Sequence, residues 1–120
     1  MICFDNNKYH CSMELTLSII GGKWKVLILW YLGKETLRFN ELQRKLGYIT
    51  PKMLTQQLRE LENNKLVNRH IYMQVPPKVE YSLSTEGESL LPILASLNGW
   101  GIDYAKNYGG SVETHEVTES

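Results

Sequence analysis

One stretch of the chain, TPKMLTQQLRELE, constrains the fold more than any other. It runs from Thr50 to Glu62, and at 100° per residue its leucines fall on one side and its polar and basic residues on the other. Thr50 suits the N-cap of a helix, and Pro51 suits its first position. We therefore predict a short helix that buries one face and exposes the other. The exposed set is Lys52, Thr55, Gln56 and Arg59.

The polar face of this predicted helix has the chemistry of a surface that reads DNA. Two cations, an amide and a hydroxyl are groups that reach phosphate oxygens and base edges in a major groove. A solvated helix face can have the same composition, so the neighbouring segments must decide between the two interpretations.

The preceding segment, RFNELQRKL at residues 38–46, has the pattern of a second amphipathic helix. Gly47 suits the position just past a helix end, and Tyr48 and Ile49 complete a three-residue turn. This spacing indicates a helix-turn-helix in which the second helix reads DNA. For Arg38 and Lys23, each near a predicted helix start on the basic side, contact with a phosphate and simple solvation are both open interpretations.

A β-hairpin pattern follows the helix pair. Apolar and polar residues alternate over 79–84, and β-forming residues occupy 66–73. Two adjacent prolines between these runs cannot donate ladder hydrogen bonds, so they predict a stiff turn. We expect a basic tip, with Lys78 as the wing residue nearest a phosphate or the minor groove. A helix-turn-helix with such a hairpin is a winged helix.

The remaining segments predict further helices. Ser12 can cap a helix at 12–20, and the next helix is apolar on nearly all sides, as expected at the centre of a small domain. A T-x-x-E capping box at Thr85 begins a last helix with a kink at Pro92. Its apolar stripe is longer than a domain of this size can cover, so we predict a dimer interface there.

The expected fold class is therefore mainly α with a small β-hairpin (α+β), a winged helix-turn-helix flanked by dimerisation helices. We expect one such domain over residues 1–110. The helices are predicted at about 12–20, 23–33, 38–46, 50–63 and 86–107, the wing hairpin at about 66–84, and a disordered tail at 111–120.

Charge is unevenly distributed along the chain, although the formal net charge is zero. Between Lys23 and Lys78, eleven Lys or Arg stand against four Glu, a local charge of +7, and the remainder carries two Lys against nine acids, a charge of −7. Screening over about 10 Å hides the distant acids from a polyanion at the middle block. The distribution therefore favours double-stranded DNA as the partner.

Several functional classes find no support in the sequence. The longest apolar run, Val26 to Leu32, has seven residues, far below the roughly 18 that indicate a membrane span, and the N-terminus does not read as a signal peptide. We expect a cytoplasmic protein with no membrane partner. No nucleotide loop or Ser-His-Asp pattern is recognisable, and the histidines lack metal-ligand spacing. We therefore expect no catalytic residues, no metal and no cofactor.

Four segments of the chain are distinctive: CSMELTLSIIGGKWKVLILWYL, RFNELQRKL, TPKMLTQQLRELE and VPPKVEYSLSTEGESLLPIL. Together they resemble the HxlR family of bacterial winged-helix transcription regulators, which are relatives of the MarR group. The resemblance covers about residues 11–101 and implies a homodimer, built largely by the first and last helices, with two recognition helices in successive major grooves. It implies contact with a pseudo-palindromic operator through Lys52, Thr55, Gln56, Arg59 and Lys78.

The resemblance also directs attention to Cys11. Several members of the family sense oxidants or electrophiles through a cysteine just before the first helix, although the common form has proline where this chain has Ser12. The helix dipole, with Lys8 and His10 nearby, favours a thiolate there. A buried cysteine without a redox role is the alternative. A sulfenate on Cys11 could be resolved by Cys3, the weaker candidate, or two Cys11 thiols could pair across a dimer.

Other functional hypotheses stay open beside a thiol-controlled DNA-binding regulator. A winged-helix module that binds protein would make the basic face incidental. A regulator could instead respond to a non-covalent small molecule at the dimer interface. A thiol peroxidase would need a general base or arginine beside Cys11 that the sequence does not identify, so we expect no enzyme.

Overall fold

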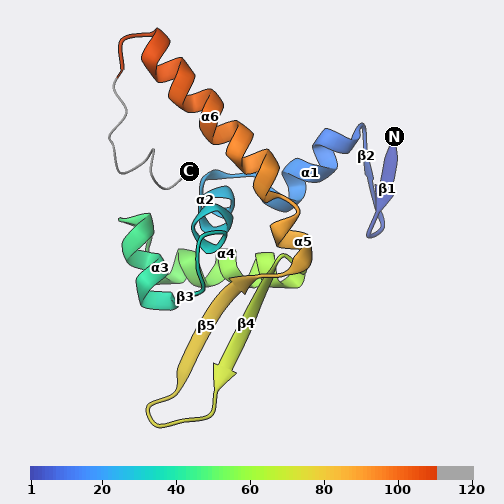
Figure 1. Cartoon of the computed structure of the whole chain (residues 1–120). Helices are drawn as coiled ribbons and strands as arrows, with labels where there is room; N and C mark the ends of the chain where they lie inside the picture. The colour runs from blue at the N-terminus through green and yellow to red at the C-terminus, as the bar shows by residue number, and fades with distance from the viewer. Residues whose placement is uncertain (111–120) are drawn as a thin grey trace.

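The computed structural model describes residues 1–110, and the predicted tail at 111–120 lies outside the described residues. Figure 1 shows a central group of helices from which a β-hairpin projects on one side and a long helix extends on the other. The elements, in chain order, are β1 (Ile2–Phe4), β2 (Asn7–Tyr9), α1 (Ser12–Ile20), α2 (Lys23–Leu32), β3 (Leu37–Arg38), α3 (Phe39–Leu46), α4 (Pro51–Asn63), β4 (Val67–Tyr72), β5 (Lys78–Leu83), α5 (Thr85–Glu88) and α6 (Leu91–Asn107).

The core lies where α2, α3 and α4 meet the base of the hairpin. Each helix contributes aliphatic side chains at helical spacing, and burying one such side chain stabilises the fold by about 1.5–3 kcal/mol. Three of the largest fully buried side chains are leucines of α4, so the prediction that its leucine side is buried is confirmed. The largest fully buried side chains are Ile28, Leu29, Leu42, Leu54, Leu58, Leu61 and Val67.

The projecting hairpin belongs to a three-stranded antiparallel sheet with the order β3-β5-β4. Tyr81 of β5 is buried opposite Leu37 of β3, which is also buried, so one side of the sheet faces the core. The sequence analysis does not predict strand β3. The helix expected at 38–46 begins one residue later, at Phe39, and Arg38 lies in β3. The α3 and α4 pair followed by this hairpin is a winged helix, so the predicted fold class is confirmed.

The prediction of one last helix with a kink is wrong, because the segment forms two helices, α5 and α6. Ser84, and not Thr85, caps α5, and its Oγ accepts a hydrogen bond from the Gly87 N–H at 3.0 Å. The same hydroxyl donates to the Lys65 carbonyl at 2.6 Å, and this contact with a residue 19 positions earlier in the chain favours Ser84 as the cap. Pro92 lies in the first turn of α6, where its missing N–H costs nothing, and it therefore begins that helix instead of kinking it.

The N-terminal segment differs from the prediction in two ways. Cys11, and not Ser12, is the N-cap of α1, and its side chain makes no capping hydrogen bond. The preceding residues form a β1–β2 hairpin that the sequence analysis does not predict. Its two-residue turn has positive φ at Asp5 (51°) and Asn6 (64°), as hairpin turns of this length require.

No single helix among residues 1–110 is long and apolar enough to cross a bilayer. The helices α1 and α2 satisfy the length and composition criteria only when they are taken together, and the chain bends by 76° between them.

Candidate DNA-binding surface

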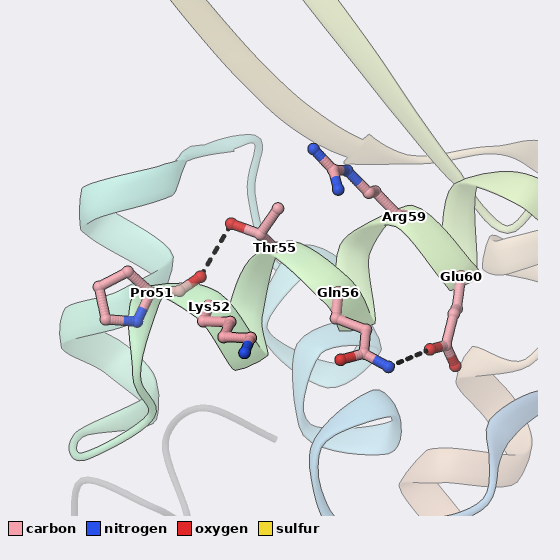
Figure 2. A pocket seen from close by; sticks show the side chains of 6 residues that line it. All are labelled: Pro51, Lys52, Thr55, Gln56, Arg59 and Glu60. Atoms are coloured by element: carbon pink, nitrogen blue, oxygen red, sulfur yellow. Dashed lines mark hydrogen bonds between the residues drawn. The ribbon is translucent and has the colours of Figure 1, made fainter.

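The exposed face of α4 forms a shallow surface at which the predicted recognition residues meet. Figure 2 shows their side chains along the helix, with the acid Glu60 at its C-terminal end. The helix begins as predicted, because Pro51 follows the N-cap and the Met53 N–H donates to Thr50 Oγ1 at 3.1 Å. The lining residues are Pro51, Lys52, Thr55, Gln56, Arg59 and Glu60.

The polar groups of this surface keep hydrogen-bonding capacity that the fold does not use. The Thr55 hydroxyl donates to the Pro51 carbonyl at 2.8 Å, and the Gln56 amide donates to Glu60 Oε2 at 3.2 Å (Figure 2). The Thr55 oxygen and the Gln56 carbonyl oxygen can still accept hydrogen bonds from a ligand. The surface therefore presents acceptors as well as cations.

Arg59 is available to a ligand because its two acidic neighbours are engaged elsewhere. Glu60 pairs with Lys25 at 2.7 Å, and Glu62 lies 3.8 Å from Arg69. Within residues 1–110, neither Lys52 nor Arg59 forms an ion pair. Glu60 and Glu62 therefore do not compete with a ligand for the Arg59 guanidinium group.

Lys25 contacts the α4 surface, and the sequence analysis does not single it out. Its side chain reaches from α2 to α4, and the residue is only 8% exposed. The hydrogen bond from Lys25, and then that from Gln56, hold the pKa of Glu60 below its ordinary value. The carboxylate on the α4 surface is thereby neutralised, which reduces its repulsion of a polyanion.

The wing differs from the predicted basic tip. Lys78 begins β5 opposite Tyr72, with its Nζ 3.5 Å from Glu80 Oε2 and 4.6 Å from the Tyr72 ring centroid. The tip at residues 73–77 carries no charge, and Met73 and Val75 there are 96% and 98% exposed. Lys78 therefore lies at the base of an uncharged tip, beside Tyr72 on the opposite strand and Glu80 on its own strand.

Arg38 lies with the wing and not with α4. It pairs with Glu80 in the register between β3 and β5. The hydrogen bond from Tyr72, followed by the charges of Lys78 and Arg38, holds the pKa of Glu80 below its ordinary value. The structure thus brings together two groups of predicted residues, one on α4 and one around Glu80.

The profile of HxlR-like helix-turn-helix proteins matches residues 19–108. The chain belongs to this HxlR-like family. It is 50% identical over 115 residues to the HTH-type transcriptional regulator YtcD of Bacillus subtilis, a match that covers 96% of this chain and 90% of YtcD. The HxlR-like family consists of transcription regulators and not of enzymes, and its helix-turn-helix binds DNA.

Solved structures of two regulators resemble this HxlR-like chain. The redox regulator HypR in its oxidised form is 49% identical, with a TM-score of 0.73 over 76% of this chain and 94% of that chain. The reduced form of the transcriptional regulator YodB from B. subtilis is 30% identical, with a TM-score of 0.70 over 83% of this chain and 98% of that chain. The fold of this chain is thus similar to the folds of these two regulators.

Cys11 and Cys3 of this HxlR-like chain are both exposed. In the β1–β2 register, Cys3 is opposite Lys8, three positions before Cys11, which corresponds to roughly 10 Å along the strands. A disulfide requires Cα atoms within about 7 Å. The hairpin therefore keeps the two thiols of one chain apart, and Cys3 can resolve Cys11 within a chain only if the hairpin opens.

The helices α1 and α6 leave a large apolar surface exposed. Trp100 and Tyr104 on α6 form a ladder with its C-cap Tyr108, with successive ring centroids 5.1 and 4.7 Å apart. Exposed apolar surface of this extent typically marks an interface. The exposed apolar side chains on and next to these helices are Met13, Leu17, Ile93, Leu97, Trp100, Tyr104 and Tyr108.

Proposed function

We propose that this regulator acts as a homodimer on a pseudo-palindromic operator, with α4 of each subunit in a major groove. The observation that carries the proposal is the exposed face of α4, whose two cations have no ion-pair partner within residues 1–110. Arg59 suits guanine or phosphate, Gln56 suits adenine, and Lys52 suits phosphate. Thr55 supports these contacts through its hydroxyl oxygen.

Three further residues have supporting roles in this proposal. Arg38 and Lys78 lie beside Glu80, and we assign them contacts with phosphates that flank the major groove. Thr50 orders the start of α4 through its cap, and its own hydroxyl hydrogen can donate to a phosphate. Arg38, Lys78 and Thr50 would thus position α4 on the duplex and would not discriminate between bases.

The exposed surfaces of α1 and α6 support the homodimer. Covering Leu97 and Trp100, which are 58% and 67% exposed, removes apolar area from water at about 25 cal/mol per Å². A second copy of the chain offers the same apolar surface, so a two-fold pair covers both. Such a pair also places two α4 helices for two half-sites.

We assign the regulatory signal to Cys11. Support comes from its exposure and from the similarity to HypR, which is described as a redox regulator. The Cys11 thiol could add across the C=C bond of an electrophile, with the sulfur on one carbon and the thiol proton on the other. Alternatively, two Cys11 thiols of a dimer could form a disulfide while one hydrogen peroxide takes up their two protons and two electrons and becomes two waters.

A small non-covalent effector has weaker support. The hollow between α2 and α6 is lined by Val26, Leu27, Trp30, Leu94, Leu97 and Asn98 and has a volume of about 190 Å³. Pockets for ligands of drug size usually occupy at least about 300 Å³.

A gel-shift titration tests the DNA-binding proposal. The chain is titrated against duplexes from the DNA that flanks its own gene and against random duplex of equal length at the same salt concentration. We expect one flanking segment to bind at least about a thousandfold more tightly than random duplex. Equal affinity for all duplexes would refute the proposal.

A cysteine series tests the signal. Operator binding is measured for the wild type, Cys11→Ser and the matched control Cys3→Ser, with and without a maleimide or diamide. We expect reagent to change binding by the wild type and Cys3→Ser and to leave Cys11→Ser unchanged. An equal response of all three proteins would remove Cys11 from the proposal.

A further inference from the structure

A cluster at the edge of the α4 surface holds one lysine between two aromatic rings. The Lys23 Nζ lies 4.5 Å from the centroid of the Trp24 ring and 4.4 Å from that of Tyr48. It also donates to the Tyr48 hydroxyl at 2.6 Å. The two rings meet edge to face at 5.8 Å. Residues 25 positions apart are therefore joined around one ammonium group.

The position of this cluster places it beside the recognition helix. Tyr48 lies in the turn between α3 and α4, directly before the residues that begin α4. Lys23 begins α2, and Lys25, two residues later, pairs with Glu60 on the α4 surface. The start of α2 therefore lies at the edge of the α4 surface, and Lys23 is not among the residues that line this surface.

Burial of apolar surface does not explain why a tyrosine stands at position 48. The residue is 78% exposed, so its ring gains little from burial. Its oxygen accepts a hydrogen bond from Lys23, which leaves the hydroxyl hydrogen free to donate outward. A hydroxyl that accepts from an ammonium is a stronger donor, because the cation polarises it.

The ammonium group is also held in place before a ligand arrives. Contact with two rings restricts the otherwise flexible Lys23 side chain, so less entropy is lost when it binds. Lys23 and Tyr48 together present a cation and a directed O–H. This pair of donors suits a single oxyanion, such as a phosphate of the DNA backbone.

We propose that Lys23 and Tyr48 form a binding site for a backbone phosphate beside each major groove that α4 enters. The inference rests on the proposed DNA-binding function and adds a contact from outside the recognition helix. Trp24 is a positioning residue, because it restricts the ammonium group and does not touch the phosphate. The site contributes to affinity on every duplex and carries no sequence information.

The salt dependence of binding tests the cation. The association constant of Lys23→Met is measured against salt concentration, on the flanking DNA and on random duplex. We expect affinity to fall about tenfold at low salt, and the slope of its logarithm against the logarithm of the salt concentration to become shallower by about 0.9 for each bound subunit. A slope equal to that of the wild type would overturn the site.

Tyr48→Phe tests the hydroxyl separately from the ring. Because phenylalanine keeps the ring and its contact with the ammonium, we expect about a fivefold loss of affinity with the salt slope unchanged. Wild-type affinity in this variant would show that the hydroxyl does not bind phosphate and would overturn the two-donor site.

Lys34 provides a matched control, because its Nζ lies 4.3 Å from the Trp30 ring at the other end of α2. Lys34→Met removes the same charge and the same type of ring contact, and we expect wild-type binding. An equal loss with Lys34→Met would overturn the site in favour of a general charge effect. If the wild type shows no preference for flanking DNA, the proposed function fails, but a shallower slope for Lys23→Met on random duplex still supports the phosphate site.

Discussion

The two longest helices, α4 and α6, differ in what they leave exposed. On α4 the leucines are almost fully buried, with Leu54, Leu58 and Leu61 between 0% and 2% exposed, and the outer face is polar. On α6 only Leu94 is buried, and the outer surface carries aliphatic and aromatic side chains. The same period of 3.6 residues thus produces opposite surfaces.

This difference separates two kinds of partner. The outer face of α4 is stable in water and gains charge-assisted contacts from a polyanion. The outer face of α6 is costly in water and gains from any apolar surface of matching shape. The helix that we propose to bind DNA and the helix that we propose to pair subunits therefore differ in the residues they expose.

The largest expected effect is on subunit pairing through α6. Replacing Leu97 with Asp puts a charge where a partner subunit would exclude water, so we expect the dissociation constant of the dimer to rise at least about a hundredfold. Sedimentation equilibrium measures the shift towards the 13.9 kDa chain. If the wild type is itself a monomer at all concentrations, the proposal that the exposed apolar surface of α6 pairs subunits is wrong.

Ala95→Glu is the control for this change. Ala95 lies on the other side of α6 from Leu97 by helical spacing, and it is also exposed. We expect this variant to pair like the wild type. Dissociation by both variants would mean that charge anywhere on α6 is disruptive, and the interface would not be confined to one side.

The next effect is on DNA binding through α4. Arg59→Ala removes a cation that has no acid partner within residues 1–110, so we expect operator affinity to fall by about 1–3 kcal/mol and discrimination between sequences to weaken. Gel shifts over a salt series measure both quantities. Lys106→Ala on α6 removes one cation from the other helix and should leave them unchanged; the reverse result would exchange the roles of the two helices.

Regular helices could be predicted from the sequence, because their period is a local property. The start of α4 at Pro51, its cap at Thr50 and its two faces follow from residues within a few positions of one another. The same holds for the bounds of α1. Local rules predict such elements well because neighbours at three and four positions decide them.

Contacts between distant residues could not be predicted in this way. Lys25 pairs with Glu60 across 35 positions, and nothing near Lys25 in the sequence indicates that its ammonium group reaches another helix. Strand β3 has only two residues, too few for an alternating pattern, and it forms because Leu37 meets Tyr81. These features depend on packing and not on local propensity.

The position of Lys78 shows the same limit within the predicted site. Its place next to two prolines indicates a hairpin tip, but the register pairs it with Tyr72 and places it in β5. Pro92 is a second case, since proline either kinks a helix or begins one, and only the cap at Ser84 and the short helix α5 decide between these outcomes.

A smaller effect is expected from the N-cap of α4. Thr50→Ala removes the acceptor for the Met53 N–H, so we expect the free energy of unfolding to fall by about 1 kcal/mol. Urea unfolding measures it. Thr50→Ser keeps the cap and should restore stability and DNA affinity together. Lost affinity in Thr50→Ser at wild-type stability would instead assign the threonine methyl group a direct contact with DNA.

The smallest effect is expected at the Lys25–Glu60 pair, which joins the polar surface of α4 to α2. Because the folded state lowers the pKa of Glu60, the pair stabilises the fold at neutral pH, and this contribution is lost as the pH falls through the lowered pKa. The Glu60 side chain is 42% exposed, so solvent screening keeps the contribution below about 1 kcal/mol. Unfolding of the wild type and Glu60→Gln over a pH series should therefore differ most at neutral pH and converge in acid. A constant difference at every pH would mean that the shape and hydrogen bonding of Glu60, and not its charge, account for its contribution to stability.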